Sequence, residues 1–347
     1  MKRLIATLLT LFTLFAFVAC VDGANDAQIE SETQTITENK TFEYKLGVVD
    51  GAPSLAVANI LDGFTYEYTE NGTKYVYNTT VDLVNGAQNI RSGVLSGDYD
   101  MAIAPLNLAS VFYNVKPELG IKLASVNIFG CLYVVGDNEV TDFSEFKGKT
   151  VISVGAGGTP DVIFRNLLAK NGVEINGEDE NSEEKVTLTY ADAASGVILA
   201  FNNGEADFAL LGEPAVTTIA GKLNKKIALN LQNEWKKAYP EVNFVQAGLC
   251  VNNKVSSESK YIDALLAKMA ENKTFIYEKA DELKDIFAKA ESTLKSTAFN
   301  ADILDRCNID CKKASTIKAD VEAFLNAVKN YNAQQIGGKL PGEDFYL

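Results

Sequence analysis

The chain has 347 residues and a formal net charge of −14, from 32 basic and 46 acidic side chains, and it contains no histidine. Beyond Arg3 its arginines are Arg91, Arg165 and Arg306, scattered along the chain, so the clustered positive charge that nucleic acid binding needs is missing. The lack of histidine removes the commonest general base and the commonest nitrogen ligand of metals, which argues against triad hydrolases and histidine-based zinc catalysis.

The start of the chain has the layout of an exported protein. Two basic residues precede an apolar run over residues 4–18, which is shorter than the about 20 residues of a membrane-spanning helix. Small residues follow and the sequence then turns polar, as in a cleaved signal peptide. We expect a signal peptide over residues 1–19. The segment Phe17-Val18-Ala19-Cys20 resembles the bacterial lipobox, which implies lipid on Cys20; an ordinary secretory signal with an incidental cysteine is the alternative.

The segment after the signal peptide is polar. Residues 20–41 are rich in Asp, Glu, Asn, Thr and Gln, and they offer too little apolar surface to offset the chain entropy lost on folding. We therefore expect a disordered tether between a lipid anchor on Cys20 and the folded part. The remainder exceeds the usual limit for one hydrophobic core of roughly 250–300 residues, so two lobes are expected.

From Tyr44 the pattern alternates strand-like runs with helical apolar spacing, broken by Gly and Pro turns. Consecutive units of this kind predict α/β lobes with mostly parallel sheets covered by helices. Strands are expected over 44–49, 74–78, 101–104, 122–127, 131–135, 151–154, 185–190, 208–211 and 246–251. Helices are expected over 55–61, 84–96, 194–202, 260–273, 274–290, 301–306 and 314–330. Two more helices are expected to begin near residues 108 and 160. Lobe one should cover 42–127 plus 249–347, and lobe two 128–248 with two crossing strands.

The cysteines other than Cys20 suggest no metal site. Cys131 and Cys250 lie in apolar strand-like runs, where a thiol behaves as a small buried hydrophobe. Cys307 and Cys311 are four residues apart without a second ligand pair, so a local disulfide or two ordinary thiols are favoured over a metal ligand set.

Several motifs, in this order, cover most of the chain and resemble one family. They are the lipobox, Asp50-Gly51-Ala52-Pro53, Gly97-Asp98-Tyr99-Asp100, Ala104-Pro105-Leu106-Asn107, Phe146-Lys147-Gly148-Lys149-Thr150, Gly204-Glu205-Ala206-Asp207, Glu213-Pro214 and Gly337-Gly338-Lys339-Leu340-Pro341. The chain is similar to periplasmic-type solute-binding proteins of ABC importers, in the branch of nitrate, sulfonate and thiamine-pyrimidine-precursor binders. The resemblance implies a type II periplasmic-binding-protein-like fold, an extracytoplasmic location, no cofactor, and an ABC permease with its ATPase as partners.

Two helix starts are the leading candidates for holding a solute. Ala52, Pro53 and Ser54 open the first helix of lobe one, and Gly157, Gly158 and Thr159 open its counterpart in lobe two. Free N–H groups and the helix dipole make such starts acceptor sites for an anion or a carbonyl. A tight turn with helix-capping acids explains the same residues without a ligand. Further candidates are Asp50, Asn107, Phe129, Tyr190, Glu213 and Gln246.

The acids favour a neutral or cationic heterocycle, such as a thiamine pyrimidine precursor, with Asp50 or Glu213 accepting its amino protons. A sulfonate- or nitrate-type anion is the alternative ligand. The sequence as a whole predicts a lipid-anchored solute receptor without catalytic activity. An enzyme or a sensor built on the same fold is the competing hypothesis.

Overall fold

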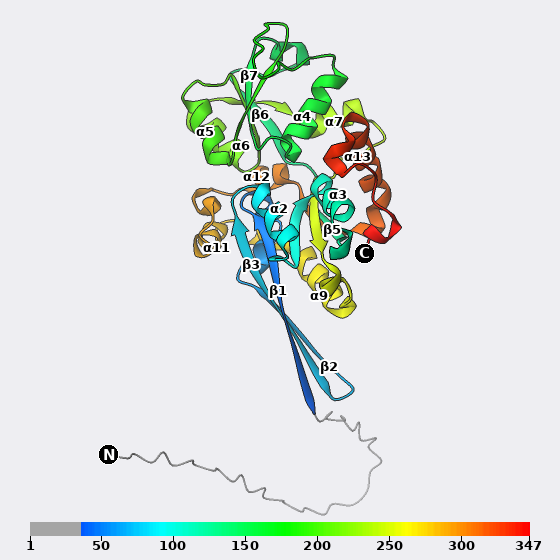
Figure 1. Cartoon of the computed structure of the whole chain (residues 1–347). Coiled ribbons are helices and arrows are strands. Elements are labelled where there is room, and N and C mark those ends of the chain that lie inside the picture. The colour runs from blue at the N-terminus through cyan, green and yellow to red at the C-terminus, as the bar shows by residue number, and fades with distance from the viewer. Residues whose placement is uncertain (1–35) are drawn as a thin grey trace, which may run out of the picture. The chain divides into compact units, whose positions relative to one another are not determined.

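The computed structural model describes residues 36–347, which form two α/β lobes, each built around one sheet (Figure 1). The predicted signal peptide, Cys20 and most of the predicted tether lie outside the described residues. The fold class expected from the sequence is confirmed. Both sheets are mixed, because antiparallel strands join the parallel ones in each lobe.

Lobe one contains a seven-stranded sheet in the order β12-β5-β11-β4-β1-β3-β2. Its strands are β1 (Glu38–Val49), β2 (Phe64–Glu70), β3 (Thr73–Val84), β4 (Met101–Pro105), β5 (Lys122–Ile128), β11 (Ala247–Val251) and β12 (Ile309–Lys313). Lobe two contains a five-stranded sheet in the order β10-β6-β9-β7-β8. Its strands are β6 (Leu132–Gly136), β7 (Thr150–Val154), β8 (Thr187–Ala191), β9 (Phe208–Gly212) and β10 (Lys226–Asn230).

Helices cover both faces of each sheet. Lobe one carries α1 (Ala52–Leu55), α2 (Ala87–Ser96), α3 (Leu106–Val115), α8 (Asn253–Ser256), α9 (Ser259–Ala270), α10 (Asn272–Glu278), α11 (Leu283–Lys289) and α12 (Ala301–Cys307). Lobe two carries α4 (Thr159–Lys170), α5 (Ala194–Asn202), α6 (Ala215–Leu223) and α7 (Leu231–Ala238). The long helix α13 (Lys318–Tyr331) follows near the C-terminus. Short 3-10 helices are η1 (Ala58–Ile60), η2 (Pro117–Leu119), η3 (Phe143–Phe146), η4 (Thr293–Ser296), η5 (Ala314–Ile317), η6 (Ala333–Ile336) and η7 (Glu343–Phe345).

A three-stranded arm projects from lobe one (Figure 1). It consists of the first part of β1 and the β2–β3 hairpin, which turns at Asn71-Gly72. The strand β2 was not predicted. The predicted tether was too long, because β1 already begins at Glu38, where it pairs with Thr73 beside the turn. Aromatic side chains stack across the strands of the arm, as in the pair Tyr68 and Tyr75, whose ring centroids are 4.8 Å apart.

Two crossing segments connect the lobes where the sequence predicts them. The first leads from β5 to β6, and the second leads from α7 back to β11. The side chain of Gln246 on the second segment accepts a hydrogen bond from Cys131 N on the first at 3.0 Å. Just beyond, Gly248 has no room for a side chain, because a Cβ there would lie 2.1 Å from the Ser125 carbonyl oxygen of β5.

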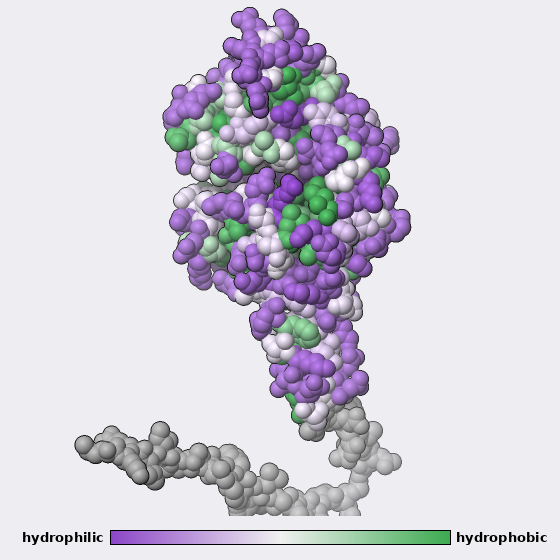
Figure 2. All heavy atoms as spheres, in the orientation of Figure 1, coloured by the Kyte–Doolittle hydropathy of each residue, from purple (hydrophilic) through white to green (hydrophobic). Residues whose placement is uncertain are grey.

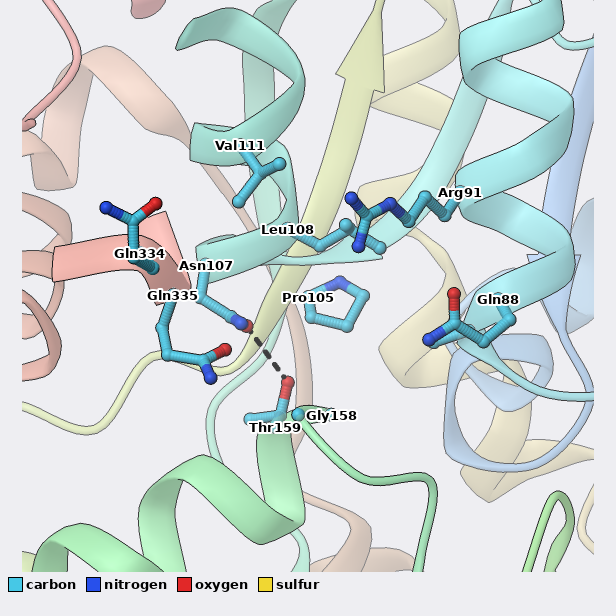
Figure 3. A pocket seen from close by; sticks show the side chains of 12 residues that line it. Gln88, Arg91, Pro105, Asn107, Leu108, Val111, Gly158, Thr159, Gln334 and Gln335 are labelled. Carbon is cyan, nitrogen blue, oxygen red and sulfur yellow. Dashed lines mark hydrogen bonds between the residues drawn. The ribbon is translucent and has the colours of Figure 1, made fainter. Parts of the chain in front are cut away.

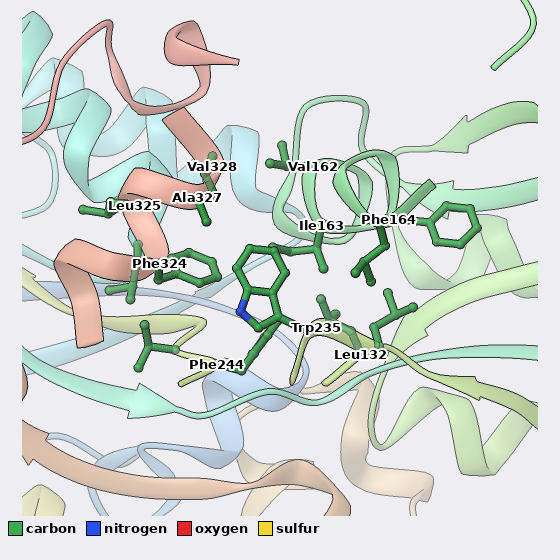
Figure 4. Packing of buried hydrophobic residues seen from close by; sticks show 14 of the residues in the cluster. Leu132, Val162, Ile163, Phe164, Trp235, Phe244, Phe324, Leu325, Ala327 and Val328 are labelled. Carbon is green, nitrogen blue, oxygen red and sulfur yellow. The ribbon is translucent and has the colours of Figure 1, made fainter. Parts of the chain in front are cut away.

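The helix α13 packs against lobe two as well as lobe one, which differs from the expected assignment of 249–347 to lobe one. Figure 4 shows Trp235 of α7 among side chains of α4 and α13. The ring centroid of Phe324 on α13 is 5.3 Å from that of Trp235. One continuous hydrophobic cluster therefore includes α3 of lobe one, α13, and α4 and α7 of lobe two. The fully buried Trp235 is a core residue.

The four described cysteines are free thiols, so the local disulfide between Cys307 and Cys311 is not formed. Within residues 36–347 no helix is both long and apolar enough to cross a membrane. Figure 2 shows a mainly hydrophilic surface with isolated hydrophobic patches and a notch between the lobes.

Candidate functional site

A small pocket lies between the lobes, with a volume of about 110 Å³. Helices α2 and α3 of lobe one, the start of α4 in lobe two and the short helix η6 enclose it (Figure 3). Its lining consists of Ala87, Gln88, Arg91, Pro105, Asn107, Leu108, Val111, Gly157, Gly158, Thr159, Gln334 and Gln335. The volume is well below the about 300–1,000 Å³ of sites for drug-sized ligands, which suits a small solute.

The structure brings four of the predicted residues together in this pocket: Asn107, Gly157, Gly158 and Thr159. Asn107 lies in the first turn of α3, and Thr159 is the first residue of α4. The Thr159 hydroxyl donates to Asn107 Oδ1 at 3.3 Å, which is a direct hydrogen bond between the lobes (Figure 3). Both side chains are buried, so this contact holds the two helix starts close together.

The loop before α4 is held by a network of charged and polar groups. Asp161 accepts a hydrogen bond from Gly157 N at 2.8 Å and pairs with Arg165 Nε at 2.6 Å. Tyr190 donates to the same carboxylate at 2.7 Å, and burial together with this bond raises its pKa. Predicted as a ligand contact, Tyr190 instead supports the loop. Because Arg165 balances the charge of Asp161, this carboxylate does not cancel the positive end of the α4 helix dipole.

Arg91 is a charged pocket residue that was not among the candidates from the sequence, and Gln88, Gln334 and Gln335 were not among them either. Arg91 lies on α2, lines the pocket and is exposed. No acidic side chain among residues 36–347 pairs with it, whereas Arg165 and Arg306 both have carboxylate partners. The chain therefore presents one uncompensated guanidinium to the pocket. The available signal was an arginine on the polar face of the helix predicted over 84–96, but nothing in the sequence places that face beside α4.

The first predicted helix start is not part of the pocket. The helix α1 has four residues, and the Ser54 hydroxyl is buried and donates to Gly51 O at 2.8 Å. Ala52 is buried and Pro53 half-buried beside it. Asp50 accepts hydrogen bonds from Thr293 N and Thr293 Oγ1, both at 2.7 Å, and another from the Ser292 hydroxyl. The Asp50 carboxylate thus caps η4, which corrects its expected role as an acceptor for a ligand.

Glu213 is also occupied within the protein. Its fully buried carboxylate lies 2.6 Å from Arg306 Nε and accepts a hydrogen bond from Thr217 N at 3.1 Å. Arg306 belongs to lobe one and Glu213 to lobe two, so this ion pair also joins the lobes. The expectation that Glu213 accepts ligand protons is corrected because its carboxylate, like that of Asp50, is already bound by other groups of the protein.

The two remaining candidates lie at the crossing segments rather than in the pocket. Phe129 N donates to Asn308 O at 3.0 Å, and Lys312 Nζ lies 5.0 Å from the Phe129 ring centroid. Gln246 joins the two segments as described above. Both residues therefore serve the connection between the lobes.

The electrostatics of the pocket follow from this arrangement. Its lining has a guanidinium, four side-chain amides, a hydroxyl and a helix start, but no carboxylate. Such groups donate hydrogen bonds to anionic oxygens. Among the described residues no group of three or more Cys, Asp or Glu side chains is placed to hold a metal ion.

No family model and no curated protein matches this sequence. Solved structures do match over most of the chain. An ABC transporter structure from Parabacteroides distasonis is 21% identical, covers 88% of this chain and 98% of its own, and has a TM-score of 0.67.

Two other neighbours are named for their ligands. The periplasmic aliphatic sulphonate binding protein SsuA from Escherichia coli is 10% identical, with 88% of this chain and 92% of that chain covered and a TM-score of 0.62. The periplasmic nitrate-binding protein NrtA from Synechocystis PCC 6803 is 15% identical, with coverage of 84% and 82% and a TM-score of 0.60. The chain therefore shares the two-lobed fold of these periplasmic binding proteins.

Proposed function

We propose that this chain is the extracytoplasmic substrate-binding lipoprotein of an ABC importer, and that its cargo is a small anion. The observation that carries the proposal is Arg91, an uncompensated guanidinium beside the start of α4 in a pocket without a carboxylate. A guanidinium and a helix start are both favourable for negative charge. The fold shared with sulphonate- and nitrate-binding proteins supports the same ligand class.

A thiamine pyrimidine precursor is less well supported, because its expected acceptors Asp50 and Glu213 already bind other groups of the protein. Binding is favoured over catalysis, since amides, a hydroxyl and a guanidinium transfer no protons readily near neutral pH. The lipid anchor on Cys20 and the permease and ATPase partners are proposed from the sequence. Replacement of Cys20 with Ser should move the protein from the membrane to the soluble fraction of its host.

The ligand class can be tested by thermal unfolding of the purified protein with nitrate, methanesulfonate, taurine and a thiamine pyrimidine precursor. A bound solute at a hundredfold excess over its Kd stabilises the fold by about 2.7 kcal/mol. We expect stabilisation by an anion in the wild type and none in Arg91→Ala. Lys284→Ala is the matched control, because it removes the same charge from an exposed position on α11. Stabilisation by the pyrimidine alone would contradict the proposed ligand class.

A further inference from the structure

The C-terminal part of the chain passes from one lobe to the other beside the pocket. The preceding helix α13 is fastened to lobe two by polar contacts as well as by its apolar face. Asn243 Nδ2 donates to Asp320 Oδ1 at 2.8 Å, and Asn166 Nδ2 of α4 lies 3.4 Å from the Ala327 carbonyl oxygen. In Figure 1, α13 lies beside α4 and α7.

The residues that follow are fastened to lobe one. Ser110 Oγ and Asn114 Nδ2 of α3 both donate to the Ile336 carbonyl oxygen, at 2.8 and 2.9 Å. Gly337 lies so close to α3 that a Cβ on it would be 2.9 Å from Asn114 Cβ. At the end of the chain, Leu347 N donates to the carbonyl oxygen of β5 residue Leu123 at 3.0 Å.

The chain therefore reaches lobe two at α13, which it enters after η5, and returns to lobe one between Tyr331 and Ile336. Asn332 is extended, with φ −154° and ψ 106°, and its side chain caps η6 by accepting a hydrogen bond from Gln334 N at 3.0 Å. Gln334 and Gln335 are thus pocket residues at the point where the chain returns to lobe one.

The side chain of Gln335 faces the loop before α4. A Cβ on Gly157 would lie 4.0 Å from both Nε2 and Oε1 of Gln335. Figure 3 shows its amide directed toward Thr159, opposite Arg91 and Gln88 across the pocket. A carboxamide in this place can donate to one oxygen of an anion whose other oxygens reach the guanidinium.

We propose that Gln335 is a specificity-determining ligand contact carried on the segment that follows α13, so that the C-terminal segment contacts the solute as well as the two lobes. This inference rests on the proposed function. A bound anion holds Gln335 between the α4 start and Arg91, because its oxygens accept hydrogen bonds from both the amide and the guanidinium.

The first test compares affinities of full-length variants for methanesulfonate and nitrate by calorimetry. Gln335→Ala should weaken binding about tenfold, the usual loss for one hydrogen bond to a charged group. Gln335→Glu should weaken it further, because the isosteric carboxylate repels an anion. Asn330→Ala, at an exposed position near the end of α13, is the control and should bind as the wild type does. Equal affinities of wild type and both Gln335 variants would overturn the proposal.

The second test separates this inference from the proposed function. Thermal unfolding of the wild type with each anion tests the ligand class alone, and the same measurement on Gln335→Ala tests the role of Gln335. If neither anion stabilises the wild type, the proposed ligand class fails. If the wild type is stabilised and Gln335→Ala is stabilised equally, only the role of Gln335 is overturned.

Discussion

Arg306 on α12 and Glu213 after β9 form an ion pair across the two lobes, with Arg306 Nε 2.6 Å from Glu213 Oε1. The same guanidinium donates through Nη2 to Thr217 Oγ1 at 2.8 Å. Glu213 is fully buried and Arg306 is 30% exposed. The pair lies outside the pocket lining, so it contributes to closure of the lobes independently of any contact with the solute.

Arg306→Ala should leave the Glu213 carboxylate buried without its partner. Loss of one member of a buried pair costs about 3–5 kcal/mol, and the partial exposure of Arg306 favours the lower end of that range. Urea unfolding measures this loss, and small-angle X-ray scattering should show a larger radius of gyration as the lobes separate. Thr217→Val removes the hydroxyl that donates to Glu213 and accepts from Arg306 but keeps the ion pair, so it should cost less, about 2 kcal/mol. An Arg306→Ala protein with unchanged stability and size would show that the pair does not hold the lobes.

Gly158→Leu should block the pocket without strain in the backbone. Gly158 has φ −73°, which any residue adopts, whereas Gly157 has φ +73° and needs glycine. A Cβ at 158 would lie 3.1 Å from the Gly155 carbonyl oxygen, so a small shift accommodates it. We expect loss of anion binding with little change of the unfolding temperature without ligand. Gly158→Ala should retain weaker binding, and unchanged binding in the leucine variant would remove this pocket as the ligand site.

The sequence predicted the two lobes and the crossing segments, and four of its candidate residues lie in the pocket, because these features depend on local patterns. The periodicity of strands and helices repeats in each half of the chain. Asn107 follows the carboxyl end of β4 and Gly158 follows that of β7, and these two ends face each other across the pocket. The hairpin at Asn71-Gly72 also had a local signal, since Asn-Gly between alternating aromatic and polar residues is typical of a two-residue turn. That signal was overlooked, so β2 was missed.

The other pocket residues had no local signal. Arg91 and Gln335 are far apart in sequence and meet only because α2 and η6 pack around the starts of α3 and α4. Asp50 and Glu213 show the opposite error. A carboxylate next to a helix start can cap a helix, pair with a distant arginine or bind a ligand, and the choice depends on partners such as Thr293 and Arg306, which come from other parts of the chain.

Tyr68→Ser should loosen the arm without disturbing the lobes. Its ring is stacked on that of Tyr75, and Nζ of Lys260 on α9 lies 4.5 Å from the centroid of the Tyr68 ring. Loss of such an aromatic pair costs about 1 kcal/mol, which corresponds to roughly fivefold faster amide exchange in the arm. Exchange measured by mass spectrometry should rise in residues 64–77 and stay unchanged in β4. Thr69→Ser, at an exposed position next in the strand, is the control.

The buried thiols should make the fold less stable at alkaline pH. Burial raises the pKa of Cys131 and of Cys250 to about 12, whereas an exposed thiol ionises near about 8.5. Above that value the unfolded chain loses protons that the folded chain keeps. The free energy of unfolding therefore falls by about 1.4 kcal/mol per pH unit for each thiol, until the folded pKa is reached.

Cys250→Ala isolates this effect, since the pKa of Cys250 is raised by burial alone. The free energy of unfolding in urea is measured at pH 9 and at pH 10. Its decrease from pH 9 to pH 10 should be about 1 kcal/mol larger in the wild type than in the variant. Each protein is compared with itself, so the cost of the missing sulfur cancels. Iodoacetamide gives an independent measurement, because it should leave Cys250 unmodified in the folded protein and alkylate it in urea. Equal losses in both proteins would mean that the thiol ionises without unfolding.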